Sequence, residues 1–152
     1  MKTAAIASLA HALALASGLS TALTAHADDG VVEKVSVRAV ARFDFDRASI
    51  RPEDRDALLA EVGKMKGVTW QTVTATGYTD AVGPAPYNAR LSAKRAKTVK
   101  SYLVGKGLSP SMIRTQAKAA AEPVADNSSE EGRAKNRRTE IEFQGVRAVA
   151  AK

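Results

Sequence analysis

The fold of this chain is decided by the stretch Gly77-Tyr78-Thr79-Asp80 and, after a short loop, Tyr87-Asn88-Ala89-Arg90-Leu91-Ser92-Ala93-Lys94-Arg95-Ala96. Residues 69–77 are rich in β-branched side chains and predict a strand that ends at Gly77. The second part predicts a helix over about 87–104, because its apolar residues recur at helical spacing and two glycines follow it.

One face of this helix combines apolar and polar residues. At about 100° per residue, an apolar stripe is formed by Leu91, Ala96, Val99 and Leu103. The same stripe contains three polar residues: Asn88, Ser92 and Arg95. The opposite, solvent side carries Arg90, Lys94, Lys97 and Ser101.

The position of Arg95 on the core-facing side points to a binding role or an ion pair. A guanidinium that is removed from water needs a paired anion or a ligand. Asp80, at the end of the preceding strand, is the nearest carboxylate in the predicted fold. The sequence therefore favours two alternatives, a ligand site that contains both residues or a direct Asp80–Arg95 ion pair that ties the helix to the strand.

Several elements of this chain, taken together, resemble the OmpA-like peptidoglycan-binding domain family. These elements are the Gly-Tyr-Thr-Asp strand end at 77–80, Gly83, Tyr87-Asn88, the Leu-Ser-x-x-Arg-Ala run at 91–96, and Gly-Arg-x-x-Asn-Arg-Arg at 132–138. An upstream Phe-Asp-Phe-Asp at 43–46 also fits the end of the family's first strand. The resemblance covers about residues 35–143, and the joint spacing is more specific than any single motif.

The remaining pattern predicts an α/β fold. Apolar and polar residues alternate over 35–43, which indicates a first strand, and Pro52 begins a first helix that ends by Gly67. The later segments predict a third strand at 112–118, a polar loop with a short helix at 122–133 and a last strand at 138–143. The order β-α-β-α-β-β predicts a mixed sheet of about four strands with both helices on one face. We expect a frayed tail over 145–152. The resemblance implies the same architecture.

Composition excludes several kinds of chemistry. The 152 residues suffice for one domain, and they contain no cysteine, which excludes disulfides and thiol catalysis. Both histidines lie within residues 1–27. Asp44 and Asp46 have no histidine, cysteine or third acid nearby to complete a catalytic or metal site. We therefore expect no enzyme, no cofactor and no metal.

The basic charge of the chain does not predict a nucleic-acid partner. Lys and Arg number 23 against 16 acidic residues, which gives a formal charge of +7. The charges are scattered, and only residues 133–138 form a dense basic cluster. A solvated basic surface explains this distribution, and the secretion signal described next argues against nucleic acid.

Residues 1–27 resemble a cleavable secretory signal. Lys2 is followed by an apolar run over 4–23, and Ala25-His26-Ala27 is a small-x-small cleavage site. An uncleaved membrane anchor is the alternative. We expect a mature single domain over 28–152 in the periplasm, with an association to the outer membrane through an envelope protein partner as a further expectation.

The resemblance implies that the domain binds peptidoglycan non-covalently, through the diaminopimelate of the stem peptide. The positions that match the family's gripping residues are Asp80 and Arg95. The free end of diaminopimelate carries an ammonium and a carboxylate on one carbon, so Asp80 can accept from the first and Arg95 can donate two hydrogen bonds to the second. Further ligand contacts are expected from Asp46, Thr79, Asn88, Leu91 and Arg137.

Most of these additional residues also have a structural interpretation. Asp46 suits a turn before a helix, Asn88 a loop or a helix cap, and Leu91 the core. Arg137 forms a basic pair with Arg138 that suits a solvated surface as well as a pocket.

The chain departs from the family pattern at 117–120. Ala-Lys-Ala-Ala stands there in place of a Gly-x-Gly-Glu segment. Because alanine tolerates a positive φ poorly, we expect a different turn. This departure and the basic cluster at 133–138 fit a second interpretation, an envelope assembly protein that keeps the fold without the ligand.

The leader should be cleaved after Ala27, since Ala25 and Ala27 are small and an acidic pair follows them. Intact mass of the protein from a periplasmic fraction measures this directly. A species that retains Met1 and floats with membranes would support the anchor instead.

Overall fold

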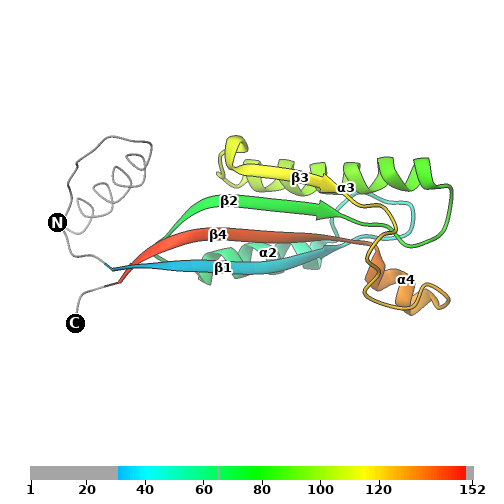
Figure 1. Ribbon diagram of the computed structural model, residues 1–152, viewed down its shortest axis with the longest axis horizontal. Coiled ribbons are helices and arrows are strands. Elements are labelled where there is room, and N and C mark those ends of the chain that lie inside the picture. The colour runs from blue at the N-terminus through cyan, green and yellow to red at the C-terminus, as the bar shows by residue number, and fades with distance from the viewer. Residues whose placement is uncertain (1–30, 65, 150–152) are drawn as a thin grey trace.

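The computed structural model describes residues 31–64 and 66–149 and shows a four-stranded sheet with two long helices against one face (Figure 1). The elements in chain order are β1 (Val31–Arg42), α2 (Pro52–Lys64), β2 (Val68–Gly77), α3 (Ala85–Gly105), the 3-10 helix η3 (Pro110–Met112), β3 (Ile113–Ala117), α4 (Glu130–Asn136) and β4 (Arg138–Val149). The predicted leader and its cleavage site lie outside these residues. None of the helices in the described ranges has the length and apolar character needed to cross a membrane.

The sheet has the strand order β1-β4-β2-β3. The last strand, β4, runs antiparallel to both of its neighbours, β1 and β2. The pair β2 and β3 is parallel, and α3 connects the two strands. The predicted mixed α/β sheet of four strands with helices on one face is therefore confirmed.

The core lies between the sheet and the helices. Alternate residues of the strands face the helices and are buried, among them Val37, Ala41, Val73, Ala75, Ile141 and Phe143. The helix α2 packs on β1 and contributes Leu58, while α3 packs on β2 and β3 and contributes Val99 and Leu103. Period-two strands that pack on a period-3.6 helix stripe are the arrangement that the sequence pattern predicts.

The predicted frayed tail is wrong for residues 145–149. They continue β4 and pair in register with the first residues of β1, from Val31↔Val149 to Val35↔Gly145. The two ends of the described chain thus lie side by side, at the end of the molecule opposite α4 (Figure 1). The local sequence does not predict either of these two strand segments, because each is stabilised by pairing with a segment that is far away in the sequence.

The last residue of β2 brings the sheet and α3 into direct backbone contact. A Cβ atom at Gly77 would overlap the carbonyl of Ser92 and crowd the amide of Ala96. Only a residue without a side chain allows this approach. The result is that the residues after β2 lie beside the polar residues of α3.

The segment 117–120, where the chain departs from the family pattern, contains a residue in the left-handed region in spite of its alanines. Ala119 has φ +51°, a conformation that costs a residue with a Cβ about 1–2 kcal/mol. Its amide donates to the hydroxyl of Ser92 (3.1 Å), and its carbonyl accepts from the amide of Thr79 (2.8 Å). These two hydrogen bonds hold the turn against both β2 and α3.

Substitution of Gly77 by alanine should lower the free energy of unfolding by about 1–3 kcal/mol, because the new methyl group must displace the backbone of α3. Gly63 is the matched control. It lies within α2, and no described atom is close to the position that its Cβ would take, so Gly63→Ala should stabilise by about 0.5–1 kcal/mol. Urea denaturation of the two variants measures both changes. Equal effects of the two substitutions would contradict the close approach at Gly77.

Candidate ligand-binding site

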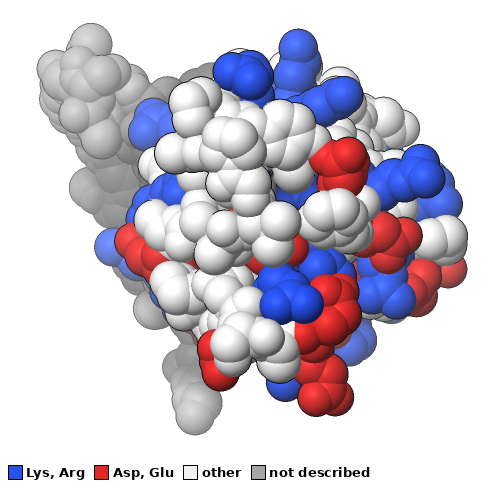
Figure 2. Space-filling view, turned by 90° about the vertical axis from the view of Figure 1, so that its right-hand side faces the viewer, with Lys and Arg blue, Asp and Glu red and all other residues white. Residues whose placement is uncertain are grey.

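A cavity of about 370 Å³ lies at the end of the molecule near α4, where the β1–α2 loop, the β2–α3 loop and the first turns of α3 meet. Figure 2 shows this end of the molecule: acidic and basic side chains lie next to one another, beside a broad surface without charged side chains. The lining residues are Phe45, Asp46, Asp80, Val82, Gly83, Pro84, Tyr87, Asn88, Leu91, Arg95 and Arg137. Six of the seven predicted site residues are therefore brought together.

Arg95 is fully buried and is held by backbone carbonyls. Its Nε donates to the carbonyl of Arg47 (2.9 Å), Nη1 to that of Tyr78 (2.9 Å) and Nη2 to that of Asp44 (3.2 Å). The guanidinium also lies 5.1 Å from the centre of the Phe43 ring. Arg95 thus joins α3 to the end of β2 and to the β1–α2 loop.

The charge of Arg95 is not neutralised by an ion pair. Within the part of the chain that the structure describes, no carboxylate lies within 4.0 Å of its guanidinium. Burial lowers the pKa of Arg95 to about 10, an effect that the nearby charge of Asp80 partly offsets. Arg95 therefore remains cationic at neutral pH, and two of its five N–H donors are left for another acceptor. The direct Asp80–Arg95 ion pair, one of the two alternatives above, is not formed.

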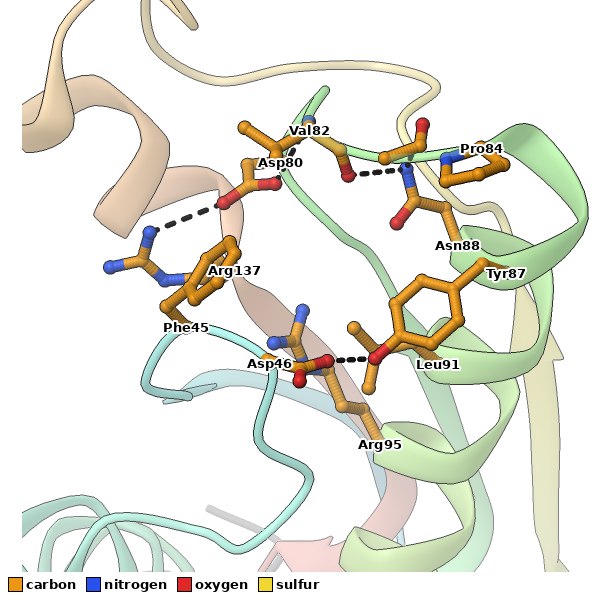
Figure 3. A pocket seen from close by; sticks show the side chains of 11 residues that line it. Phe45, Asp46, Asp80, Val82, Pro84, Tyr87, Asn88, Leu91, Arg95 and Arg137 are labelled. Atoms are coloured by element: carbon orange, nitrogen blue, oxygen red, sulfur yellow. Dashed lines mark hydrogen bonds and ion pairs between the residues drawn. The ribbon is translucent and has the colours of Figure 1, made fainter.

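Asp80 is buried and pairs with Arg137 instead. One carboxylate oxygen of Asp80 lies 3.2 Å from Nη1 of Arg137, and the other accepts from the amide of Val82 at 3.1 Å. Figure 3 shows this pair on one side of the cavity, with the guanidinium of Arg95 on another side. The structure therefore places two cations around one buried carboxylate.

Arg137 and Arg138 are both buried, so they do not form a solvated surface pair. Arg137 turns toward the cavity, where its Nε donates to the carbonyl of Phe43 (3.1 Å) and its Nη2 donates to Glu130 (2.9 Å). The hydrogen bond from Arg137 lowers the pKa of the Glu130 carboxylate below its usual value. Arg138 turns the other way and stacks on Tyr78, with its guanidinium 3.9 Å from the ring centre.

The β2–α3 loop is fixed by Asn88. Its buried amide donates to the carbonyl of Val82 (3.0 Å), and Gly83 in the same loop has φ +95°. Asn88 thus fixes the loop and lines the cavity at once, and Leu91, half-buried one turn further along α3, forms part of the wall.

Asp46 is hydrogen-bonded to Tyr87, a residue for which the sequence predicted no ligand contact. The hydroxyl of Tyr87 donates to the carboxylate of Asp46, and Figure 3 shows this bond crossing the mouth of the cavity in front of Arg95. Asp46 has φ +55°, so its backbone is in the left-handed region. Tyr87 belongs to the Tyr-Asn motif at 87–88, and this motif was the feature of the sequence that could have identified it as a site residue. Phe45 and Val82, two further lining residues that were missed, are exposed apolar side chains in loops.

Thr79 is the predicted site residue that does not line the cavity. Its side chain is buried, and its hydroxyl has no hydrogen-bond partner among the described atoms. Its amide donates to Ala119, so the residue connects the strand end to the turn at 118–121.

The charges around the cavity suit a zwitterion. Two guanidinium groups, from Arg95 and Arg137, face two carboxylates, from Asp80 and Asp46. A ligand that carries an ammonium and a carboxylate close together finds a partner for each. Among residues 31–64 and 66–149, no group of three or more acidic, histidine or cysteine side chains is placed to hold a metal ion.

The chain belongs to the OmpA family, whose family model matches residues 42–137. The chain is 43% identical over 114 residues to outer membrane protein A of Bordetella avium, covering 75% of this chain. It is 34% identical over 116 residues to the peptidoglycan-associated lipoprotein of Pseudomonas aeruginosa, covering 75% of this chain and 68% of that protein. The peptidoglycan-associated lipoprotein of Burkholderia pseudomallei superimposes with a TM-score of 0.62 at 27% identity, over 70% of this chain and 90% of that one.

The region of similarity covers only part of the length of some of these relatives. The chain spans 59% of the Bordetella avium protein and 30% of the peptidoglycan-binding protein ArfA of Mycobacterium bovis, to which it is 43% identical over 99 residues, 65% of this chain. These relatives are named as outer-membrane, peptidoglycan-binding and peptidoglycan-associated proteins.

Substitution of Arg95 by methionine should lower the free energy of unfolding by about 2–5 kcal/mol, because it leaves three carbonyls without their donor, that of Tyr78 in a buried and those of Arg47 and Asp44 in part-buried hydrogen bonds. The matched control is Lys97→Met on the exposed side of the same helix, which should change it by less than about 0.5 kcal/mol. Thermal and urea unfolding measure both. Similar stabilities of the two variants would show that Arg95 does not hold the two loops.

Proposed function

We propose that this protein binds peptidoglycan in the cell envelope, through the free end of diaminopimelate in the stem peptide. Family membership supports the general part of this proposal, since relatives of this chain are named for peptidoglycan binding or association. The expected secretory leader supports a periplasmic location, with attachment to the outer membrane through a protein partner as a further part of the proposal.

The observation that carries the proposal is the buried, cationic Arg95, which has no anionic partner among the residues that the structure describes. A charge that is desolvated in this way is strongly destabilising unless something compensates it, and the three carbonyls supply only part of the compensation. A carboxylate that enters the cavity can accept the two remaining N–H donors of Arg95. The ammonium group of the same ligand can donate a hydrogen bond to the carboxylate of Asp80, which Arg137 holds in place.

The charges that line the cavity also support a zwitterionic ligand over a simple anion. Asp80 and Asp46 would repel an anion that lacks a neighbouring ammonium. An amine without a carboxylate would leave Arg95 unpaired. Both charged groups of the ligand are therefore needed, and diaminopimelate carries both at its free end.

Asp80→Asn should weaken binding of a diaminopimelate tripeptide by about 30-fold or more, because it removes the anion that accepts the ligand's ammonium. Asparagine keeps the shape of the side chain and an oxygen for the amide of Val82. The control is Asp56→Asn, an exposed position on α2 outside the cavity. Calorimetry measures both affinities, and unfolding curves verify the fold. If a folded Asp80→Asn variant binds the peptide with unchanged affinity, the ion pair between Asp80 and Arg137 has only a structural role.

A tripeptide with lysine in place of diaminopimelate should bind at least about ten-fold more weakly to the wild-type protein. Lysine keeps the ammonium but lacks the carboxylate, so Arg95 stays unpaired in the complex. Amidation of that carboxylate in diaminopimelate should have the same effect. Equal affinities for the lysine and diaminopimelate peptides would show that Arg95 does not recognise the carboxylate.

A further inference from the structure

A second cavity, of about 230 Å³, lies next to the first on the outer side of α3. The two cavities share one wall, formed by Asp46, Tyr87 and Leu91. The rest of the second cavity is lined by Ala48 from the β1–α2 loop and by Arg90 and Lys94 from α3. A ligand that fills the first cavity and extends past Tyr87 would enter the second.

The two basic residues of this second cavity form no ion pair with any residue in the described part of the chain. Arg90 and Lys94 are exposed, and within the described ranges no carboxylate lies within 4.0 Å of either, whereas Arg133 and Arg147 each pair with a glutamate. They lie four residues apart on one helix, a spacing at which like charges destabilise the helix. The chain thus keeps an unfavourable pair of charges at the edge of the site.

The surroundings of this pair also favour an anion. The first turn of α3 contains no acidic residue, although the positive end of a helix favours negative charge there. The only acid that lines the second cavity is Asp46, and its carboxylate accepts from the Tyr87 hydroxyl on the shared wall. Two cations against one carboxylate leave a net positive charge, whereas the charges that line the first cavity are balanced.

We propose that the second cavity binds a second carboxylate of the same peptide, carried by the residue that precedes diaminopimelate. This inference rests on the proposed function. In a diaminopimelate stem the preceding residue is a glutamate linked through its γ-carboxyl, so its α-carboxylate is free. With the amino-acid end of diaminopimelate in the first cavity, Arg90 and Lys94 bind that α-carboxylate in the second. The protein thereby distinguishes stem peptides whose glutamate is free from those in which it is amidated.

The test is calorimetry with two diaminopimelate tripeptides that differ only at the glutamate α-carboxyl, free or amidated. The wild-type protein should bind the free form about five-fold more tightly, since exposed ion pairs are individually weak. The double variant Arg90→Gln, Lys94→Gln should bind both peptides with the affinity that the wild type shows for the amidated form. The control is Lys97→Gln, Arg114→Gln, which removes the same charge from exposed positions outside both cavities and should keep the five-fold difference.

Three results would overturn the inference: equal affinity of the wild-type protein for the two peptides, a preference that survives in the Arg90/Lys94 variant, or a preference that the control variant loses as well. In each case the affinity of the wild-type protein for the amidated peptide tests ligand binding in the first cavity alone, because this peptide lacks the carboxylate proposed for the second cavity. If that binding is present, the proposed function stands and only the second carboxylate site falls. If neither peptide binds, both proposals fail together.

Discussion

The site depends on one buried guanidinium. Arg95 ties α3 to the end of β2 and to the β1–α2 loop through three carbonyls, yet its positive charge has no anionic partner in the described chain. The same side chain therefore positions the walls of the cavity and keeps two donors for a ligand. Because a buried charge is stabilised mainly by its partners, we expect removal of Arg95 to affect folding and, under the proposed function, ligand binding as well, whereas Asp80→Asn should mainly affect ligand binding.

The backbone around Arg95 is arranged so that this side chain can be buried. Gly77 lets α3 lie directly on the end of β2, and Ser92 then receives the amide of Ala119 from the turn after β3. On the other side, Arg137 joins the start of β4 to Asp80. Strand ends, a helix and two loops thus converge at one end of the sheet (Figure 1). Figure 3 shows the side chains from these elements around the cavity. The charged residues there are fixed before any ligand enters, which reduces the entropy lost on binding.

Local patterns in the sequence predicted the elements and most of the site. The helical stripe with Asn88, Ser92 and Arg95 on the buried side is confirmed, since all three are buried. Partners that depend on tertiary structure were not predictable. Asp80 pairs with Arg137, 57 residues away, rather than with the nearer Arg95. The pairing of residues 31–34 with 146–149 has the same cause. The bond between Tyr87 and Asp46 likewise joins the first turn of α3 to the β1–α2 loop, which only the complete fold brings together.

The most direct measurement is a crystal structure of this protein with meso-diaminopimelate bound. The account predicts one ligand carboxylate on the free N–H groups of Arg95, at a distance of about 2.7–2.9 Å, and the ammonium of the same carbon on Asp80. Ligand density elsewhere on the surface, or in the cavity with the carboxylate turned away from Arg95, would contradict it.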